Sequence, residues 1–194
     1  MLFTIDTNCI IDLETNSEFA EPLRELVAAH RRGEANVAMP SISASELQRD
    51  GTYLERFDDF RERVVAADLG DLPLIDAIAY WGISFYGCGY LANESMSELE
   101  RKIHAVLHAD IEMNYQEFCE RRGLQPDTVA LDPRWRNAMC DTQALWSYVH
   151  HPRDCFVTRD KNFLKKTKLP ALAQLGAGRI LLPTDAVRIL RPAA

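Results

Sequence analysis

Four acidic residues stand near the ends of predicted elements, where carboxylates could take part in chemistry. They are Asp6, Glu46, Asp141 and Asp160. Asp6 and Asp160 follow short apolar strands, at residues 2–5 and 155–158. Because the carboxyl ends of parallel strands open onto one shared crevice, acids that are distant in the sequence can meet there. Carboxylates gathered in one crevice repel one another unless a divalent cation neutralises them.

The composition of this set predicts a site for Mg²⁺ or Mn²⁺ and, through it, phosphate chemistry. A two-metal phosphodiester site needs three or four acids around ions about 3.5–4 Å apart. No group of His or Cys residues has the spacing of a zinc site. We therefore expect all four acids to be metal ligands.

Each acid also has a structural interpretation. Asp6 and Asp160 could be helix caps or turn residues. Ser43-x-x-Glu46 matches a capping box, which needs no active site. Asp141 differs, because it lies in the middle of a predicted helix among small and apolar residues, where Asp is a poor helix former. Its carboxylate is therefore expected to face something specific rather than bulk solvent.

The elements that must position these acids alternate between strand and helix. Strands are predicted at 2–5, 37–39, 155–158 and 178–183, and helices at about 9–13, 21–32, 41–47, 133–150 and 162–164. Asp132-Pro133 is a typical helix entry, with Asp as the N-cap and Pro at the first helical position. The alternation implies right-handed crossovers and a parallel sheet, which places the chain in the α/β class.

The middle segment (residues 51–132) is predicted to be helical, without a strand. Residues 53–67 and 97–122 are its two candidate helices, and the second carries a long apolar stripe. Residues 74–91 are apolar and rich in aromatic side chains. These could form a buried helix or a partner surface. The aromatic rings could stack on bases, or they could pack in a core or a dimer.

Composition and charge narrow the class of protein. With 194 residues the chain is expected to be a single domain, 1–194. A net charge of −7 argues against a surface that coats nucleic acid, but it is compatible with a nuclease whose bound metal cancels part of the charge. Five scattered cysteines without a C-x-x-C pair favour a reducing cytoplasm. No signal peptide is visible, and no apolar stretch is long enough to predict a membrane span.

Four segments of the chain together resemble the PIN-domain family, the metal-dependent ribonuclease fold of VapC-type toxins in bacterial toxin–antitoxin pairs. Residues 3–12 resemble the family's opening hydrophobic strand, which is followed by Asp-Thr-Asn and a small apolar helix. Residues 40–47 resemble the segment that carries the second acid, and Asp141 takes the place of the third. Residues 156–163 are similar to the closing Thr-x-Asp segment with its trailing Phe. The matches cover about 1–50 and 133–183.

The resemblance implies a three-layer α/β/α sandwich with a central parallel sheet. Small toxins of this family are shorter, and the excess here is a helical insertion at about 51–132, between the second and third acids. The resemblance also implies a Mg²⁺- or Mn²⁺-dependent endoribonuclease in which the four acids are catalytic. RNA would be the substrate, and an antitoxin protein and a homodimer are candidate partners. Many relatives carry a further acid at the position of Asn162.

Four other residues are candidates for substrate binding. Asn8 and Thr158 could hydrogen bond to a metal-bound water or to phosphate, or they could stabilise turns. Arg159 and Lys161 flank Asp160 and could form a basic rim that attracts RNA phosphates, or be solvated surface charges. The same two interpretations apply to Lys165, Lys166, Lys168, Arg134 and Arg136.

Three other classes of function are alternatives to the metal-dependent ribonuclease. A catalytically inactive PIN-like module that binds protein or RNA through the middle segment is the main alternative. A haloacid-dehalogenase-type phosphatase would need an Asp two residues after Asp6, where this chain has Asn8. A dinucleotide-binding dehydrogenase is disfavoured because no G-x-G-x-x-G follows the first strand.

Overall fold

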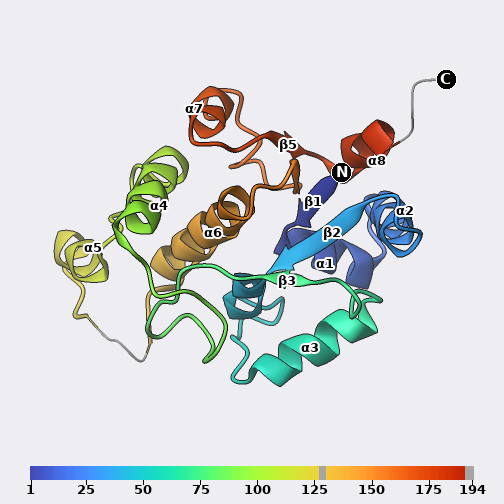
Figure 1. Ribbon diagram of the computed structural model, residues 1–194. Coiled ribbons are helices and arrows are strands. Elements are labelled where there is room, and N and C mark those ends of the chain that lie inside the picture. Colours follow the sequence, from blue (N-terminus) through green and yellow to red (C-terminus); the bar gives the residue numbers. More distant parts are fainter. Residues whose placement is uncertain (127–129, 191–194) are drawn as a thin grey trace.

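Five short strands form one parallel sheet at the centre of the protein (Figure 1). The computed structural model describes residues 1–126 and 130–190. The strands are β1 (Leu2–Ile5), β2 (Asn36–Pro40), β3 (Leu74–Ile75), β4 (Cys155–Val157) and β5 (Arg179–Leu181). Their order is β3-β2-β1-β4-β5, and all neighbouring pairs are parallel. The predicted α/β class with a central parallel sheet is confirmed.

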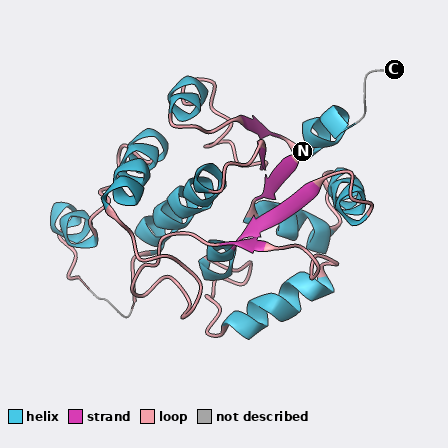
Figure 2. Cartoon of the chain, in the orientation of Figure 1, coloured by secondary structure: helices cyan, strands magenta, loops and turns pink. Residues whose placement is uncertain are grey.

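Helices cover both faces of the sheet (Figure 2). Residues of α1, α2, α3 and α8 share one hydrophobic cluster with the sheet, and residues of α4, α5, α6 and α7 share the other. Their bounds are α1 (Thr7–Thr15), α2 (Ala20–Arg31), α3 (Phe57–Ala66), α4 (Glu94–Leu107), α5 (Tyr115–Arg122), α6 (Pro133–His150), α7 (Leu169–Gln174) and α8 (Pro183–Leu190). The arrangement has the three layers that the resemblance implied.

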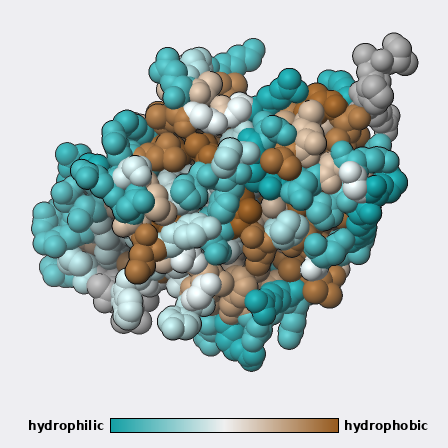
Figure 3. All heavy atoms as spheres, viewed as in Figure 1, coloured by the Kyte–Doolittle hydropathy of each residue, from teal (hydrophilic) through white to brown (hydrophobic). Residues whose placement is uncertain are grey.

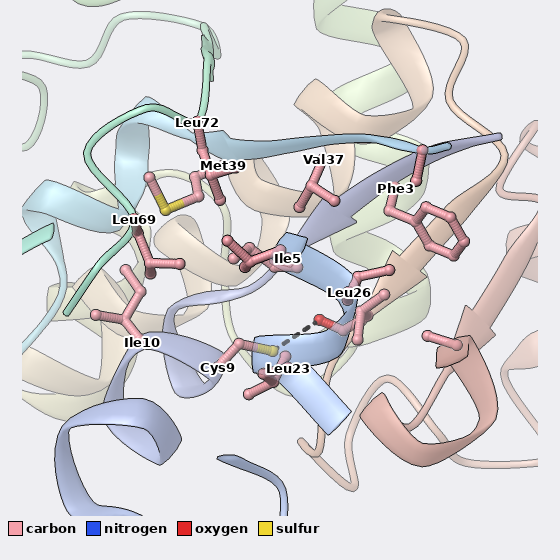
Figure 4. Close-up of a cluster of buried hydrophobic side chains, with 14 of the residues drawn as sticks. Phe3, Ile5, Cys9, Ile10, Leu23, Leu26, Val37, Met39, Leu69 and Leu72 are labelled. Atoms are coloured by element: carbon pink, nitrogen blue, oxygen red, sulfur yellow. Dashed lines mark hydrogen bonds between the residues drawn. The ribbon is translucent and has the colours of Figure 1, made fainter. Parts of the chain in front are cut away.

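Side chains along the central strands alternate between the two clusters, as the pleat of a strand requires. In β1, Phe3 and Ile5 are buried in the first cluster (Figure 4). In β4, Cys155 and Val157 face this same cluster, whereas Phe156 lies in the second. Burial on both faces explains why these strands are short, nearly continuous apolar runs.

The helices predicted at 41–47 and 97–122 differ from the structure in type or extent. Residues 41–47 form no α-helix; a 3₁₀ helix, η1 (Ser41–Ser45), is followed by extended backbone at Glu46. The expected helix at 97–122 is two helices, α4 and α5, because the backbone leaves the helical region at His108 and Asn114 caps the next helix. The apolar pattern in the sequence does not reveal the break between α4 and α5, because Ile111 in the connecting loop also packs against the core.

The middle segment also departs from its prediction. It contains β3, which pairs with β2, so this stretch contributes an edge strand to the sheet.

The predicted helix at residues 162–164 is also wrong, because these residues form a turn. The backbone N–H of Asn162 donates to Asp160 Oδ1 over 2.6 Å. A side chain that accepts a hydrogen bond two residues ahead favours an Asx turn over a helix.

Residues 77–93 fold as a loop, not as the buried helix considered above. Two hydrogen bonds between Tyr90 and residues 77 and 79 close its base, at 2.8 and 3.0 Å. Trp81, Tyr86 and Leu91 are more than nine-tenths exposed, so the core interpretation is wrong for them. Elsewhere, hydrophilic side chains cover much of the face in Figure 3, notably at the left where α5 lies. Among the described residues, no helix is long and apolar enough to cross a membrane.

Candidate metal centre

Asp6 and Asp160 are brought together by the pairing of β1 with β4. Ile5 lies opposite Val157 in the parallel register, and the backbone N–H of Asp6 donates to the carbonyl oxygen of Val157 over 3.0 Å. One residue further, the Thr158 hydroxyl donates to Asp6 Oδ2 over 2.8 Å and accepts from the Asp160 backbone N–H at 2.9 Å. Thr158 therefore connects the first and fourth acids.

Asp6 is also the N-cap of α1, as its structural interpretation predicted. Its Oδ1 accepts from the Thr7 backbone N–H over 2.8 Å. Its Oδ2 accepts from the Asn8 side-chain amide over 2.5 Å as well as from Thr158. The predicted residues Asn8 and Thr158 thus hold the Asp6 carboxylate and contact one another at 2.9 Å. Turn stabilisation, the alternative given for them, accounts for these contacts equally well.

Glu46 reaches the site from the end of η1. Its backbone is extended, with φ −78° and ψ 157°, and it is the C-terminal boundary of the 3₁₀ helix. The carboxylate accepts from the Thr7 hydroxyl, with 2.5 Å between Oγ1 and Oε1. The capping-box interpretation of Ser43-x-x-Glu46 is therefore wrong, because no α-helix begins there.

Asp141 lies in the middle of α6, a helix in which most residues from Trp135 to Tyr148 are buried. Its Oδ2 lies 3.2 Å from Nε2 of His108, the residue that follows α4. The polar contact explains why an Asp is tolerated within this helix. The predicted Asp132 cap of α6 is confirmed by its hydrogen bond with the Arg134 backbone N–H at 2.8 Å.

The electrostatics show that these carboxyl groups influence one another. Burial, followed by the charges of Asp141 and Asp160, raises the pKa of Asp6 to about 7. Burial and the charges of Asp6 and Asp141 raise the pKa of Glu46 well above its usual range. Burial also raises the pKa of Asp141, and its contact with His108 opposes that shift. The four predicted acids therefore share one electrostatic environment.

The donor set suits a hard divalent cation, because carboxylate oxygens are the ligands that Mg²⁺ and Mn²⁺ prefer. Asp6 is buried, and the other three acids are half-buried. A cation would relieve the repulsion that raises the pKa values of these groups. Among the described residues, however, no three His, Cys, Asp or Glu side chains are already arranged as a metal-holding group. The acids are instead hydrogen bonded to their own neighbours. The backbone of Asp6 is fixed by its hydrogen bond to β4 and that of Asp141 by α6, whereas carboxylate side chains can reorient around an ion.

The predicted basic rim is only partly available to a substrate. Arg159 Nε contacts Asp12 Oδ2 at 2.9 Å, and Asp12 is buried. Lys161, Lys165 and Lys166 are exposed. Lys168 is half-buried and donates to the carbonyl oxygen of Leu107 and to Asn162 Oδ1, both at 2.5 Å.

The arginines on α6 also have partners. Arg136 Nε donates to the Ser45 carbonyl oxygen over 3.0 Å, and its guanidinium lies 3.7 Å from the centre of the Tyr53 ring. Arg134 is exposed and lies 3.7 Å from Asp132. Arg136 therefore ties α6 to the residue that precedes Glu46, which is a structural role.

Sequence reasoning missed several residues of this site. Thr7 belongs to the Asp-Thr-Asn motif, but the sequence did not indicate that its hydroxyl holds Glu46. His108 gave no signal, because its position at the end of α4 depends on how that helix packs against α6. Asp12, one turn after Asn8 on α1, could have been noticed as a further acid in an apolar helix.

No family model matches this chain, and no curated protein matches it. Among solved structures, the chain is similar to one in the crystal structure of VapBC2 from Rickettsia felis bound to a DNA fragment from their promoter. The similarity covers 94% of this chain and 98% of that chain, with 13% sequence identity and a TM-score of 0.45. At this level of similarity, function has to be argued from the site itself.

Proposed function

We propose that this protein is a Mg²⁺- or Mn²⁺-dependent endoribonuclease that hydrolyses phosphodiester bonds in RNA. The observation that supports the proposal is the effect that four acids from separate segments of the chain have on one another's ionisation. Asp6, Asp141 and Glu46 have raised pKa values, and in each case another of these acids contributes to the shift. Such a concentration of partly buried negative charge is costly for folding and is typical of a site that binds cations.

In this proposal the metal ligands are Asp6, Glu46, Asp141 and Asp160. A bound ion would lower the pKa of a coordinated water and stabilise the charge that develops on the leaving oxygen. Thr158 and Asn8 fix the orientation of the Asp6 carboxylate, and Thr7 fixes that of Glu46. Lys161, exposed beside Asp160, is the best placed of the predicted rim residues to attract an RNA phosphate.

The test is cleavage of a labelled single-stranded RNA in the presence of Mg²⁺ or Mn²⁺. We expect activity from the wild-type protein, inhibition by EDTA, and a loss of at least about 100-fold for Asp6→Asn and Asp141→Asn. Calorimetry with Mn²⁺ should show binding by the wild type and weaker binding by Asp160→Ala. Equal activity of the wild type and both Asn variants would reject the proposal and favour the inactive binding module.

The proposal extends to a toxin that is controlled by an antitoxin protein. It is supported by the motif resemblance at residues 3–12 and 156–163. Expression in a bacterium should arrest growth for the wild type but not for Asp141→Asn, and co-expression of a small protein encoded by a neighbouring gene should restore it. Growth unaffected by an enzyme that cleaves RNA in vitro would argue for RNA processing instead.

A further inference from the structure

The end of α4 contacts Asp141 and the segment that follows Asp160. The last residue of this helix, Leu107, offers its carbonyl oxygen to Lys168 Nζ and to the Asn162 side-chain amide, at 2.5 and 3.3 Å. The next residue, His108, places Nε2 3.2 Å from Asp141 Oδ2. Two consecutive residues of the middle segment therefore contact both acidic motifs of the C-terminal half.

The backbone around His108 is held by hydrogen bonds on both sides. Its N–H donates to the His104 carbonyl oxygen over 2.7 Å, and its own carbonyl oxygen accepts from the Ile111 N–H over 3.0 Å. The ring lies 5.7 Å from that of His104, whose Nδ1 is 3.1 Å from Thr142 Oγ1. Thr142 is the neighbour of Asp141 on α6, so α4 and α6 are fixed to one another at this level.

The imidazole of His108 lies beside the carboxylate of Asp141. Its side chain is 12% exposed, and within the described residues Nε2 has no hydrogen-bond partner of good angular geometry. The 3.2 Å contact with Asp141 Oδ2 is therefore the polar interaction available to a buried ring nitrogen. A buried donor without a partner destabilises the folded state, so a hydrogen bond within this pair would be favourable.

We propose that His108 is a positioning residue for Asp141, so that the middle segment supplies part of the metal centre. The inference rests on the proposed function. In it, the Nε2–H of His108 binds Oδ2 and leaves Oδ1 of Asp141 for the ion. Ligand carboxylates are themselves commonly held by hydrogen bonds, and loss of such a partner typically costs 10–100-fold in metal affinity. Asn162 fits the same arrangement, because its amide can donate to the Leu107 carbonyl oxygen whereas a carboxylate could not.

The experiment compares His108→Gln, His108→Asn and His108→Leu with the wild type by calorimetric titration with Mn²⁺, alongside thermal unfolding in EDTA. The side-chain amide of Gln can occupy the place of Nε2, whereas that of Asn is too short to reach Asp141. We expect about a tenfold loss of Mn²⁺ affinity for Leu and Asn, and affinity within about threefold of the wild type for Gln. His150→Leu, which removes an exposed histidine, is the matched control and should bind normally.

The outcomes separate this inference from the proposed function. Unchanged affinity in His108→Asn and His108→Leu would overturn the positioning role while leaving the nuclease proposal intact. Tighter binding in these two variants would also overturn it, since His108 would then compete with the ion. If His108→Leu does not fold, the comparison of Gln with Asn decides. Failure of the folded wild type to bind Mn²⁺ or Mg²⁺ would reject the proposed function, and with it this role of His108.

Discussion

The hydroxyl of Thr7 donates to Glu46 Oε1 over 2.5 Å and so connects the first turn of α1 to the residue that follows η1. Thr7 is buried, and Glu46 has extended backbone without a helix to hold it. Among the causes that act on Glu46, this contact lowers the pKa, whereas burial and the charge of Asp6 raise it. The threonine therefore helps to keep the Glu46 carboxylate in place beside α1.

Replacing Thr7 with Val should weaken metal binding while preserving the shape of the side chain. A hydrogen bond to a charged group contributes about 1.5–3 kcal/mol, which corresponds to roughly a 10–100-fold loss of Mn²⁺ affinity if Glu46 is a ligand. Calorimetric titration with Mn²⁺ measures the loss. Thr15→Val is the control, because this exposed threonine at the end of α1 bonds only to the backbone of its own helix. Equal affinity of Thr7→Val and the wild type would show that Glu46 does not bind the ion.

Asp141→Asn should stabilise the metal-free protein although it abolishes activity. Burial raises the pKa of Asp141, so ionising this group costs more in the folded than in the unfolded state. The cost is absent at pH values below the pKa that Asp141 has in the unfolded state, and it develops as the pH rises above about 4. It is complete above the pKa of Asp141 in the folded state. The variant should therefore gain about 0.5–2 kcal/mol at pH 8 in EDTA, as substitutions that relieve a strained functional site commonly do.

Urea unfolding at pH 4 and pH 8 checks this expectation. Asp59→Asn on α3 is a suitable control, because its backbone belongs to the helices of the opposite face and it should give no gain. A loss of stability in Asp141→Asn at pH 8 would mean that the contact with His108 outweighs the cost of burying the charge.

Much of the sheet could be predicted from the sequence, because its strands are apolar runs with acids or prolines at their ends. β1, β2 and β4 lie where the pattern placed them, and Asp132-Pro133 fixed the start of α6. The middle segment was harder. β3 has only two residues and forms by pairing with β2. The end of α4 could not be predicted because apolar residues of the following loop also pack against the core. Local patterns do not contain such information.

The four acids could be predicted from their places after strands and within α6, but their partners could not. Thr7 and Thr158 are sequence neighbours of acids, yet the acid that Thr7 holds is 39 residues away. His108 depends on the packing of α4 against α6, which no local feature encodes. The exposed Trp81 and Tyr86 were ambiguous because aromatic residues favour both cores and surfaces that bind partners.

Glu100 should make stability depend on pH independently of the metal centre. This residue of α4 is 2% exposed and accepts a hydrogen bond from Gln143. Burial raises its pKa to about 7, above its usual value of 4.5. Glu100 therefore stays protonated to a higher pH in the folded state than in the unfolded state. Its contribution to the free energy of unfolding falls as the pH rises from about 4.5 to about 7 and is constant above that.

Glu100→Gln should remove this part of the pH dependence. Relative to the wild type, the variant should gain about 3 kcal/mol in unfolding free energy between about pH 4 and pH 8. Denaturant titrations at several pH values in EDTA measure it. Glu98→Gln is matched to it, because Glu98 lies exposed on the same helix and pairs with Lys102 at 2.7 Å. A pH profile of Glu100→Gln that parallels the wild type would contradict the raised pKa.

Arg159 should matter for stability more than for RNA binding. Its Nε contacts Oδ2 of the buried Asp12 at 2.9 Å, and the other carboxylate oxygen accepts from the Ser17 hydroxyl over 2.7 Å. Arg159→Met would leave a buried negative charge without its cation, so we expect a loss of about 1–3 kcal/mol. Adding Asp12→Asn should recover much of that loss, because the double variant no longer buries the charge.

Lys161 provides the contrast, since it is exposed next to Asp160 and has no acidic partner within 4.0 Å among the described residues. Lys161→Met should leave the unfolding free energy within about 0.5 kcal/mol of the wild type. It should nevertheless weaken RNA binding and reduce the slope of log Kd against log salt by about 1, as expected for one lost phosphate contact. If Arg159→Met instead retained full stability and lowered RNA affinity with a reduced salt slope, the guanidinium would belong to the substrate rim rather than to Asp12.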